Sequence, residues 1–209
     1  MNLNSLFTRA LCYKAVLLVA LVLLASCNKD DATPYPPIVT EFADLKADAQ
    51  GRLATLITDD DRTLRISNPV EGFQKNAGYR AVCGFVREGD GEATIYSLQA
   101  VAFLRDSTAT HRHDPVAAVS VWGTRRYINM HLRPMTRGGQ QYWGFCIDSI
   151  KGRTAYVQLY HNQNDDPLAY SQDVYASLPV DSIPGHASLD TIRLTIPTFK
   201  QNKTWTILR

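Results

Sequence analysis

From Ile38 onward the chain consists of short runs of β-branched and aromatic residues, separated by glycine, asparagine, aspartate and proline. No stretch shows the apolar repeat of about 3.6 residues that marks an amphipathic helix. Short apolar runs with turn residues between them are typical of an all-β protein. The pattern therefore predicts an all-β fold class.

The first group of runs predicts a small barrel. We expect strands over residues 38–46, 52–58, 63–67, 79–87 and 93–104. Glu88-Gly89-Asp90-Gly91 predicts a hairpin turn between the last two, because glycine tolerates positive φ angles. The longer connection 68–78 falls where an OB-fold barrel carries its helix or loop. These features predict an OB-fold-like five-stranded domain over residues 38–108.

A polar segment, residues 109–115, is interpreted as a linker to a second domain. Beyond it we expect strands over 116–122, 125–133, 141–149, 154–160, 172–179, 189–197 and 204–208. Ile128, Met130 and Leu132 alternate with polar neighbours, which predicts a strand with one buried face. Short strands at this regular spacing indicate an immunoglobulin-like antiparallel β-sandwich over residues 116–209.

The first 26 residues have the pattern of a secretion signal. Arg9 and Lys14 precede the apolar run 15–25, which is shorter than the roughly 20 residues of a membrane-spanning helix. Leu24-Ala25-Ser26-Cys27 resembles the lipobox of bacterial lipoproteins, so we expect cleavage before Cys27 and lipidation of its thiol. The alternative is an ordinary N-terminal membrane helix in which Cys27 has no special role.

The residues after Cys27 indicate where in the cell the protein is located. Lys29, Asp30 and Asp31 resemble the surface-export signal of lipoproteins in one group of Gram-negative bacteria. Residues 27–37 are polar and proline-rich, as expected for a tether, and a solvated tether alone also explains the charges. We predict an outer-membrane lipoprotein exposed at the cell surface, with the membrane contacted through the lipid anchor.

Charge and cysteine content narrow the function classes. Residues 1–26 hold two basic and no acidic residues, so the 22 basic residues of the chain fall to 20, equal to the 20 acidic ones. A net charge of zero gives no electrostatic case for nucleic acid as a partner. Cys83 and Cys146 could form a disulfide in an oxidising compartment, but their separate predicted domains favour two buried free thiols.

Candidate metal and catalytic residues are few. In His111-Arg112-His113-Asp114 two histidines could reach one ion, but Arg112 opposes a cation and Asp114-Pro115 is typical of a turn. The acidic segments 59–61 and 162–166 lack EF-hand spacing and are explained by turn chemistry. Neither a nucleophile elbow nor a phosphate-binding loop is present in the sequence. We expect no metal site, no cofactor, no catalytic residues and no enzymatic activity.

Three tyrosines form the candidate ligand site. Tyr142, Tyr156 and Tyr160 are expected on the faces opposite the apolar residues of their strands. If these strands are neighbours, the rings form a platform that could stack on a sugar or a peptide. The alternative is cross-strand aromatic pairing that only stabilises the sheet.

Two segments of the second half suggest a family. Val121-Trp122-Gly123 followed by residues 127–132 resembles the tryptophan hairpin of the NigD-like lipoproteins, and residues 159–165 resemble their segment of His-Asn and an acidic turn. The lipobox, the tether, the five-strand unit and the sandwich occur in the same order. The resemblance implies an OB-like domain, a C-terminal sandwich and an envelope location, and it carries over no catalytic residue.

The sequence thus predicts a surface-anchored, non-enzymatic binding module. The export signal and the tyrosines favour capture of a glycan or nutrient. The alternative, suggested by the family name, is a protein–protein role in the envelope such as bacteriocin-associated immunity or assembly.

Overall fold

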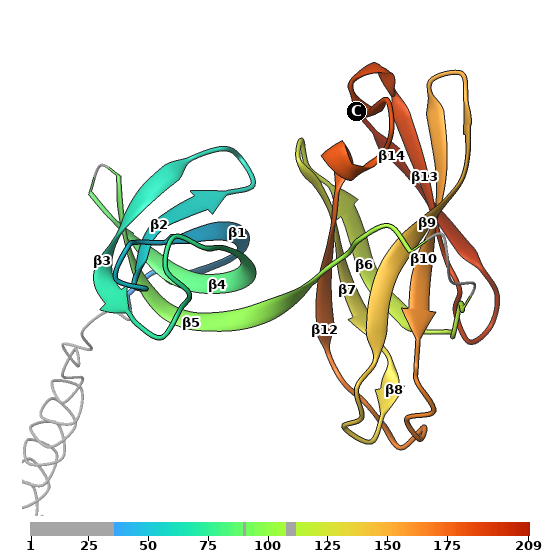
Figure 1. Ribbon diagram of the computed structural model, residues 1–209, viewed down its shortest axis with the longest axis horizontal. Coiled ribbons are helices and arrows are strands. Elements are labelled where there is room, and N and C mark those ends of the chain that lie inside the picture. Colours follow the sequence, from blue (N-terminus) through green and yellow to red (C-terminus); the bar gives the residue numbers. More distant parts are fainter. Residues whose placement is uncertain (1–35, 90, 108–111) are drawn as a thin grey trace, which may run out of the picture. The chain divides into compact units, whose positions relative to one another are not determined.

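The computed structural model describes residues 36–89, 91–107 and 112–209 (Figure 1). Cys27, Lys29, Asp30 and Asp31 lie outside these residues. Pro37–Arg209 forms one compact unit. Within the described ranges the regular structure consists of β-strands and two 3-10 turns, and no helix there is long and apolar enough to cross a membrane. The all-β fold class is confirmed.

The first five strands form a closed ring. They are β1 (Val39–Ala47), β2 (Leu53–Thr58), β3 (Thr63–Val70), β4 (Gly78–Glu88) and β5 (Glu92–Phe103). They lie in the order β3-β2-β1-β4-β5, and β3 pairs back onto β5 in parallel through Arg65↔Glu92 and Ile66↔Ala93. The ring has no free edge at this point, which confirms the OB-fold-like barrel.

Apolar residues at alternate positions of these strands point inward, because a small barrel must fill its interior with side chains. The largest fully buried barrel residues are Leu45, Leu53, Leu56 and Phe85. The connection between β3 and β4 contains turns rather than a helix. It is fixed by the hydrogen bond from Phe73 N to Gly51 O (3.1 Å), and a Cβ at Gly51 would lie only 2.5 Å from Phe73 O.

The remaining long strands form the second domain. These are β6 (Ala117–Gly123), β7 (Tyr127–Arg133), β9 (Tyr142–Lys151), β10 (Thr154–Asn162), β12 (Val174–Pro179), β13 (Thr191–Ile196) and β14 (Lys203–Leu208). One layer has the order β5-β12-β7-β6 and the other β14-β13-β10-β9. Residues of both layers share one core, which includes Leu104, Met130, Phe145, Leu159 and Leu194. This arrangement confirms the β-sandwich.

Two pairings in the sandwich are parallel, unlike the antiparallel sheets expected from the sequence. Thr154–Gln158 of β10 pair with Thr191–Thr195 of β13, and Val101–Phe103 of β5 pair with Tyr175–Ser177 of β12. Parallel neighbours need a crossover connection. Here β12, in the opposite layer, lies between β10 and β13 in the chain and provides that crossover.

Four short elements were not expected. They are β8 (Met135–Thr136), which pairs with β11 (Tyr170–Ser171), and the 3-10 turns η1 (Val180–Ser182) and η2 (His186–Ser188). Elements of two or three residues are too short to show a hydrophobic period.

Strand β5 belongs to both domains (Figure 1). Its earlier residues pair with β4 in the barrel, and its last three pair with β12 in the sandwich. Leu104, which the sequence analysis assigned to the barrel, is fully buried in the sandwich core. The two domains are therefore joined by a continuous strand as well as by side-chain contacts.

Candidate functional site

A buried arginine lies where the barrel meets the sandwich. The side chain of Arg80, on β4, is only 2% exposed. Its Nη1 donates to Asp44 Oδ1 (3.2 Å), and its Nη2 lies 2.7 Å from Asp59 Oδ1. A buried cation is costly unless it is paired and hydrogen-bonded, and these two carboxylates of the barrel supply the pairing.

The sandwich completes the coordination of Arg80. Its Nε donates to Ser177 Oγ and its Nη2 to Asn129 Oδ1, both at 3.2 Å. Asn129 Nδ2 in turn donates to Asp59 Oδ2 (2.6 Å). Asn129 was expected on the exposed face of β7, but it is fully buried because it bonds to both charges of this pair. Polar residues of the sandwich therefore satisfy a charge buried in the barrel.

Asp44 extends the same cluster. Its carboxylate pairs with Arg126 and accepts a hydrogen bond from Tyr127 Oη (3.1 Å). Burial raises the pKa of the Tyr127 hydroxyl to about 12, with a further contribution from the negative charge of Asp44, so the hydroxyl stays protonated as a donor. We call the set Asp44, Asp59, Arg80, Arg126, Tyr127, Asn129 and Ser177 the Arg80 network.

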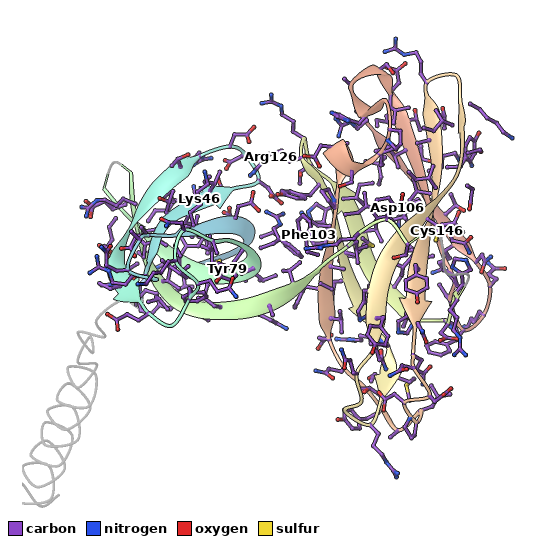
Figure 2. The ribbon with its side chains drawn as sticks, viewed as in Figure 1. Lys46, Tyr79, Phe103, Asp106, Arg126 and Cys146 are labelled. Atoms are coloured by element: carbon purple, nitrogen blue, oxygen red, sulfur yellow. The ribbon has the colours of Figure 1, made fainter. Side chains whose placement is uncertain are left out.

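A cleft of about 690 Å³ lies beside the Arg80 network. Its charged lining residues are Lys46, Arg80, Arg105, Arg126 and Asp44, four cations and one anion. Tyr79, Phe103 and Tyr127 supply three aromatic rings, of which Tyr79 and Phe103 are labelled in Figure 2. A pocket of this size with convergent charged and aromatic groups is the default candidate for a binding site.

A second cleft, of about 760 Å³, shares Phe103, Arg126 and Tyr127 with the first. Asp61, Arg125, His186 and Arg209 also contribute to its lining. Asp61 pairs with both Arg125 and Arg126 at 3.1 Å, and Asp181 adds a second anion to the lining, so the excess of cations is smaller here than in the first cleft. The first cleft is therefore the stronger candidate for a ligand site, because its cations outnumber its anions by more.

The three candidate tyrosines differ in exposure. Tyr142 is 44% exposed, and the centre of the Tyr156 ring lies 5.6 Å from Lys151 Nζ and 5.8 Å from the guanidinium carbon of Arg193. Tyr160 is only 7% exposed, which contradicts its expected place on an exposed platform. The three do share a face of the paired strands β9 and β10, because Tyr142 lies opposite Asn162 and Tyr160 opposite Gly144. Burial of Tyr160 leaves no continuous ring surface on that face.

The histidine-rich segment is part of the sandwich. His111 lies outside the described residues. His113 forms a β-bridge with His161, and its Nδ1 lies 3.1 Å from Leu159 O. The described ranges contain no group of three or more histidine, cysteine or acidic side chains suited to a metal ion. His113 thus already has a structural contact.

His161 occupies a dry, hydrogen-bonded position. Its ring stacks on Trp143 with centroids 4.1 Å apart, and its two nitrogens lie 3.0 Å from Asp114 O and from Gln141 Oε1. Burial lowers the pKa of His161 below its ordinary value despite the nearby Asp114. The His-Asn segment is therefore structural in this chain.

The acidic turn after β10 also has a structural role. Asp166 accepts hydrogen bonds from Thr136 Oγ1, Arg137 N (3.0 Å) and Gln141 Nε2 (3.0 Å). These bonds, with that from Thr136 foremost, hold the pKa of Asp166 below its ordinary value. The other acidic segment, 59–61, contributes Asp59 to the Arg80 network and Asp61 to the second cleft.

Cys83 and Cys146 are both buried. Cys83 lies in the barrel core, where burial raises the pKa of its thiol to about 12. Burial, with the neighbouring Asp106 and Asp148, also raises the pKa of Cys146. Neither thiol is thereby activated as a nucleophile.

The Arg80 network and its cleft were not predicted from the sequence. One signal was present: Arg80 interrupts the apolar run Tyr79–Val86, and a charge at that place has to be paired if the run is buried. Its partners come from β1, the turn after β2, β7 and β12, and a single sequence contains no indication of which of these segments meet.

The structure thus defines a class: an OB-like barrel joined to a β-sandwich, with a cationic, aromatic cleft beside the junction. A family model described as the NigD-like C-terminal beta sandwich domain matches residues 100–209. The chain belongs to the NigD-like family.

Solved structures share this architecture. A NigD-like immunity protein from Bacteroides caccae is 27% identical, with a TM-score of 0.63 over 82% of this chain and 92% of that one. A protein of unknown function from Bacteroides vulgatus is 15% identical, with a TM-score of 0.65 over 82% and 90%. A candidate lipoprotein from Bacteroides fragilis is 11% identical, with a TM-score of 0.63 over 83% and 98%. No curated protein matches the chain.

Proposed function

We propose that this chain is a non-enzymatic binding module of the cell envelope, and that the 690 Å³ cleft is its ligand site. The observation that carries the proposal is Phe103, which is 45% exposed at a cleft whose cations are positioned by a buried network. An exposed large apolar ring beside fixed charges is typical of a recognition surface.

The proposed location rests on the N-terminal sequence. Cys27 in its lipobox would carry the lipid, residues 27–37 would form the tether, and Lys29, Asp30 and Asp31 would direct export to the outer face of the outer membrane. Several acyl chains give firm anchoring where one chain binds only marginally. The matched family model spans residues 100–209, so support for the anchor comes from the N-terminal sequence itself.

The proposed ligand is a glycan or a nutrient derived from one. Phe103 presents an apolar ring, and Tyr79 adds a second ring whose hydroxyl accepts a hydrogen bond from Gln74 N (2.7 Å). Aromatic rings of this kind can pack against the C–H face of a sugar, while nearby charged groups bind its polar substituents.

A glycan array followed by titration calorimetry tests this proposal, using the lipidated chain in detergent. We expect binding to at least one polysaccharide, and we expect Phe103→Ala to weaken it. Phe199→Ala is the matched control, because Phe199 is similarly exposed but lies outside both clefts. Absence of binding to every glycan, or equal loss with both variants, would contradict glycan capture at this site.

A second candidate function is immunity through protein–protein contact. The 27% identical relative is described as a NigD-like immunity protein. In addition, β6 is an edge strand with exposed Val119 and Trp122, and edge strands can pair with a strand of another protein. Cells lacking the chain should then become sensitive to a bacteriocin of a neighbouring strain, and unchanged resistance would contradict this function.

A further inference from the structure

We infer that the ligand of the 690 Å³ cleft is an anionic saccharide, with a carboxylate or sulfate group on its ring. This inference rests on the proposed glycan-binding function and specifies its ligand class. It follows from the charge balance of the cleft, the fixed geometry of its floor and the exposed aromatic ring.

The first observation is unbalanced positive charge. Lys46 and Arg105 line the cleft with exposed side chains, and neither forms an ion pair within the described part of the chain. The mature sequence has no net charge, so this excess is local to the site. Cations that converge on a cleft attract an oxyanion and can form charge-assisted hydrogen bonds with it.

The one acidic residue of the lining does not cancel this charge. Both oxygens of Asp44 already serve the Arg80 network: Oδ1 binds Arg80 (3.2 Å), Oδ2 binds Arg126, and Tyr127 Oη lies 3.1 Å from each. The positive charges of Arg80 and Arg126 offset Asp44 and also Asp59. The net field in the cleft therefore comes from Lys46 and Arg105.

The second observation is that the site is preorganised. Arg126 Nη2 donates to Thr58 O (3.0 Å), which fixes its guanidinium at the wall of the cleft. The backbone of Arg105 is fixed because its carbonyl accepts a hydrogen bond from Phe145 N (3.0 Å) in β9. The wall of the cleft and the backbone that carries Arg105 are thus held before the ligand arrives, which lowers the conformational entropy lost on binding.

The third observation is an exposed aromatic ring, which indicates the chemistry of the uncharged part of the ligand. Phe103 packs edge-on against Tyr127, with ring centroids 6.3 Å apart, and leaves part of its ring exposed in the cleft. A sugar ring offers an apolar C–H face and an anionic substituent at its rim, which matches an exposed aromatic ring beside cations. The volume of about 690 Å³ suits a small ligand such as a disaccharide rather than a folded partner.

Calorimetric titration of the lipidated chain in detergent tests the inference with four probes: digalacturonate, a sulfated galactose disaccharide, neutral galactobiose and a hexapeptide of glutamate. We expect at least one charged disaccharide to bind about tenfold or more tightly than galactobiose. We also expect its binding to weaken as ionic strength rises, whereas binding of the neutral sugar does not. The first two probes distinguish carboxylate from sulfate recognition.

Variants localise the effect. Lys46→Ala and Arg105→Ala should each weaken the charged sugar by about tenfold and leave the neutral sugar unchanged. Lys200→Ala, which removes an exposed cation outside both clefts, should change neither. Phe103→Ala should weaken both sugars.

The outcomes separate the inference from the proposed function. One outcome is that charged and neutral sugars bind with equal affinity and that both depend on Phe103. That result would contradict the inference that the ligand is anionic, but not the proposal that the cleft binds a glycan. Binding of the glutamate peptide alone would overturn both in favour of a protein partner. Binding of no probe by a correctly folded chain would overturn the anionic inference, and the wider glycan array then decides the function separately.

Discussion

The guanidinium carbon of Arg80 lies 3.8 Å from the centre of the Tyr127 ring. Arg80 belongs to β4 of the barrel and Tyr127 to β7 of the sandwich. Such a cation–π contact adds to the ion pairs of Arg80 with Asp44 and Asp59, and it is strongest where water is excluded. One side chain therefore connects the two domains and supports the wall of the candidate ligand cleft.

Replacing Arg80 should be strongly destabilising. Arg80→Leu removes the counter-charge of Asp59 and leaves Asp44 paired with Arg126 alone, so we expect a loss of about 3–5 kcal/mol in the free energy of unfolding. Arg65→Ala is the control, because Arg65 pairs with Glu92 at the surface, where a pair contributes about 0–1 kcal/mol. Urea unfolding followed by circular dichroism measures both, and equal effects would contradict the structural role of the network.

Much of the fold could be predicted because each long strand has its own local pattern. The alternation of Ile128, Met130 and Leu132 predicted the buried face of β7, and all three are fully buried. The Gly89 and Gly91 turn predicted the β4–β5 hairpin, and both glycines have positive φ. These features depend on turn chemistry and a period of two residues, which a single sequence contains.

The site could not be predicted in the same way, because it depends on contacts between distant strands. Asn129 has the polar pattern of a surface residue, and only its contact with Arg80, 49 residues away in sequence, explains its burial. Tyr160 lies on the opposite face of its strand from Leu159, as predicted, but both residues are buried. Alternation distinguishes the two faces of a strand, but it does not show whether other parts of the chain cover each face.

Stability should fall at acidic pH partly through Asp166. The folded-state pKa of this carboxyl is below its ordinary value of 3.8, so its contribution is complete above that value and is lost as pH falls through the folded-state pKa. Asp166→Asn should therefore reduce stability at pH 6 and flatten the pH dependence below 3.8. Urea unfolding at several pH values measures this.

Asp165→Asn is the control for that experiment, because it removes the same charge from an adjacent side chain that is almost fully exposed. We expect it to leave both the stability and its acid dependence close to those of the natural chain. An identical acid profile for Asp166→Asn and the natural chain would contradict the hydrogen-bonded role of Asp166.

The thiols of Cys83 and Cys146 should be unreactive in the native state. Cys83 and Cys146 are buried with raised pKa values, so little thiolate is available at pH 8. Ellman's reagent should react slowly with the native chain and should detect both thiols after denaturation in guanidinium without a reductant. Detection of none after denaturation would indicate a disulfide and contradict the structure.

Lipidation should depend on Cys27 alone. Cells grown with a labelled fatty acid should incorporate it into the natural chain, and Cys27→Ala should abolish both the label and the membrane association. Cys83→Ala leaves the lipobox intact and should retain the label. A labelled Cys27→Ala chain would contradict the lipobox assignment, and an unlabelled natural chain would remove the proposed anchor.

The most direct test of the ligand cleft is a crystal structure of the chain with digalacturonate. We expect a sugar ring against Phe103, with its carboxylate within hydrogen-bonding distance of Lys46 or Arg105. A sugar bound instead on the face that carries Tyr142 and Tyr156 would contradict it.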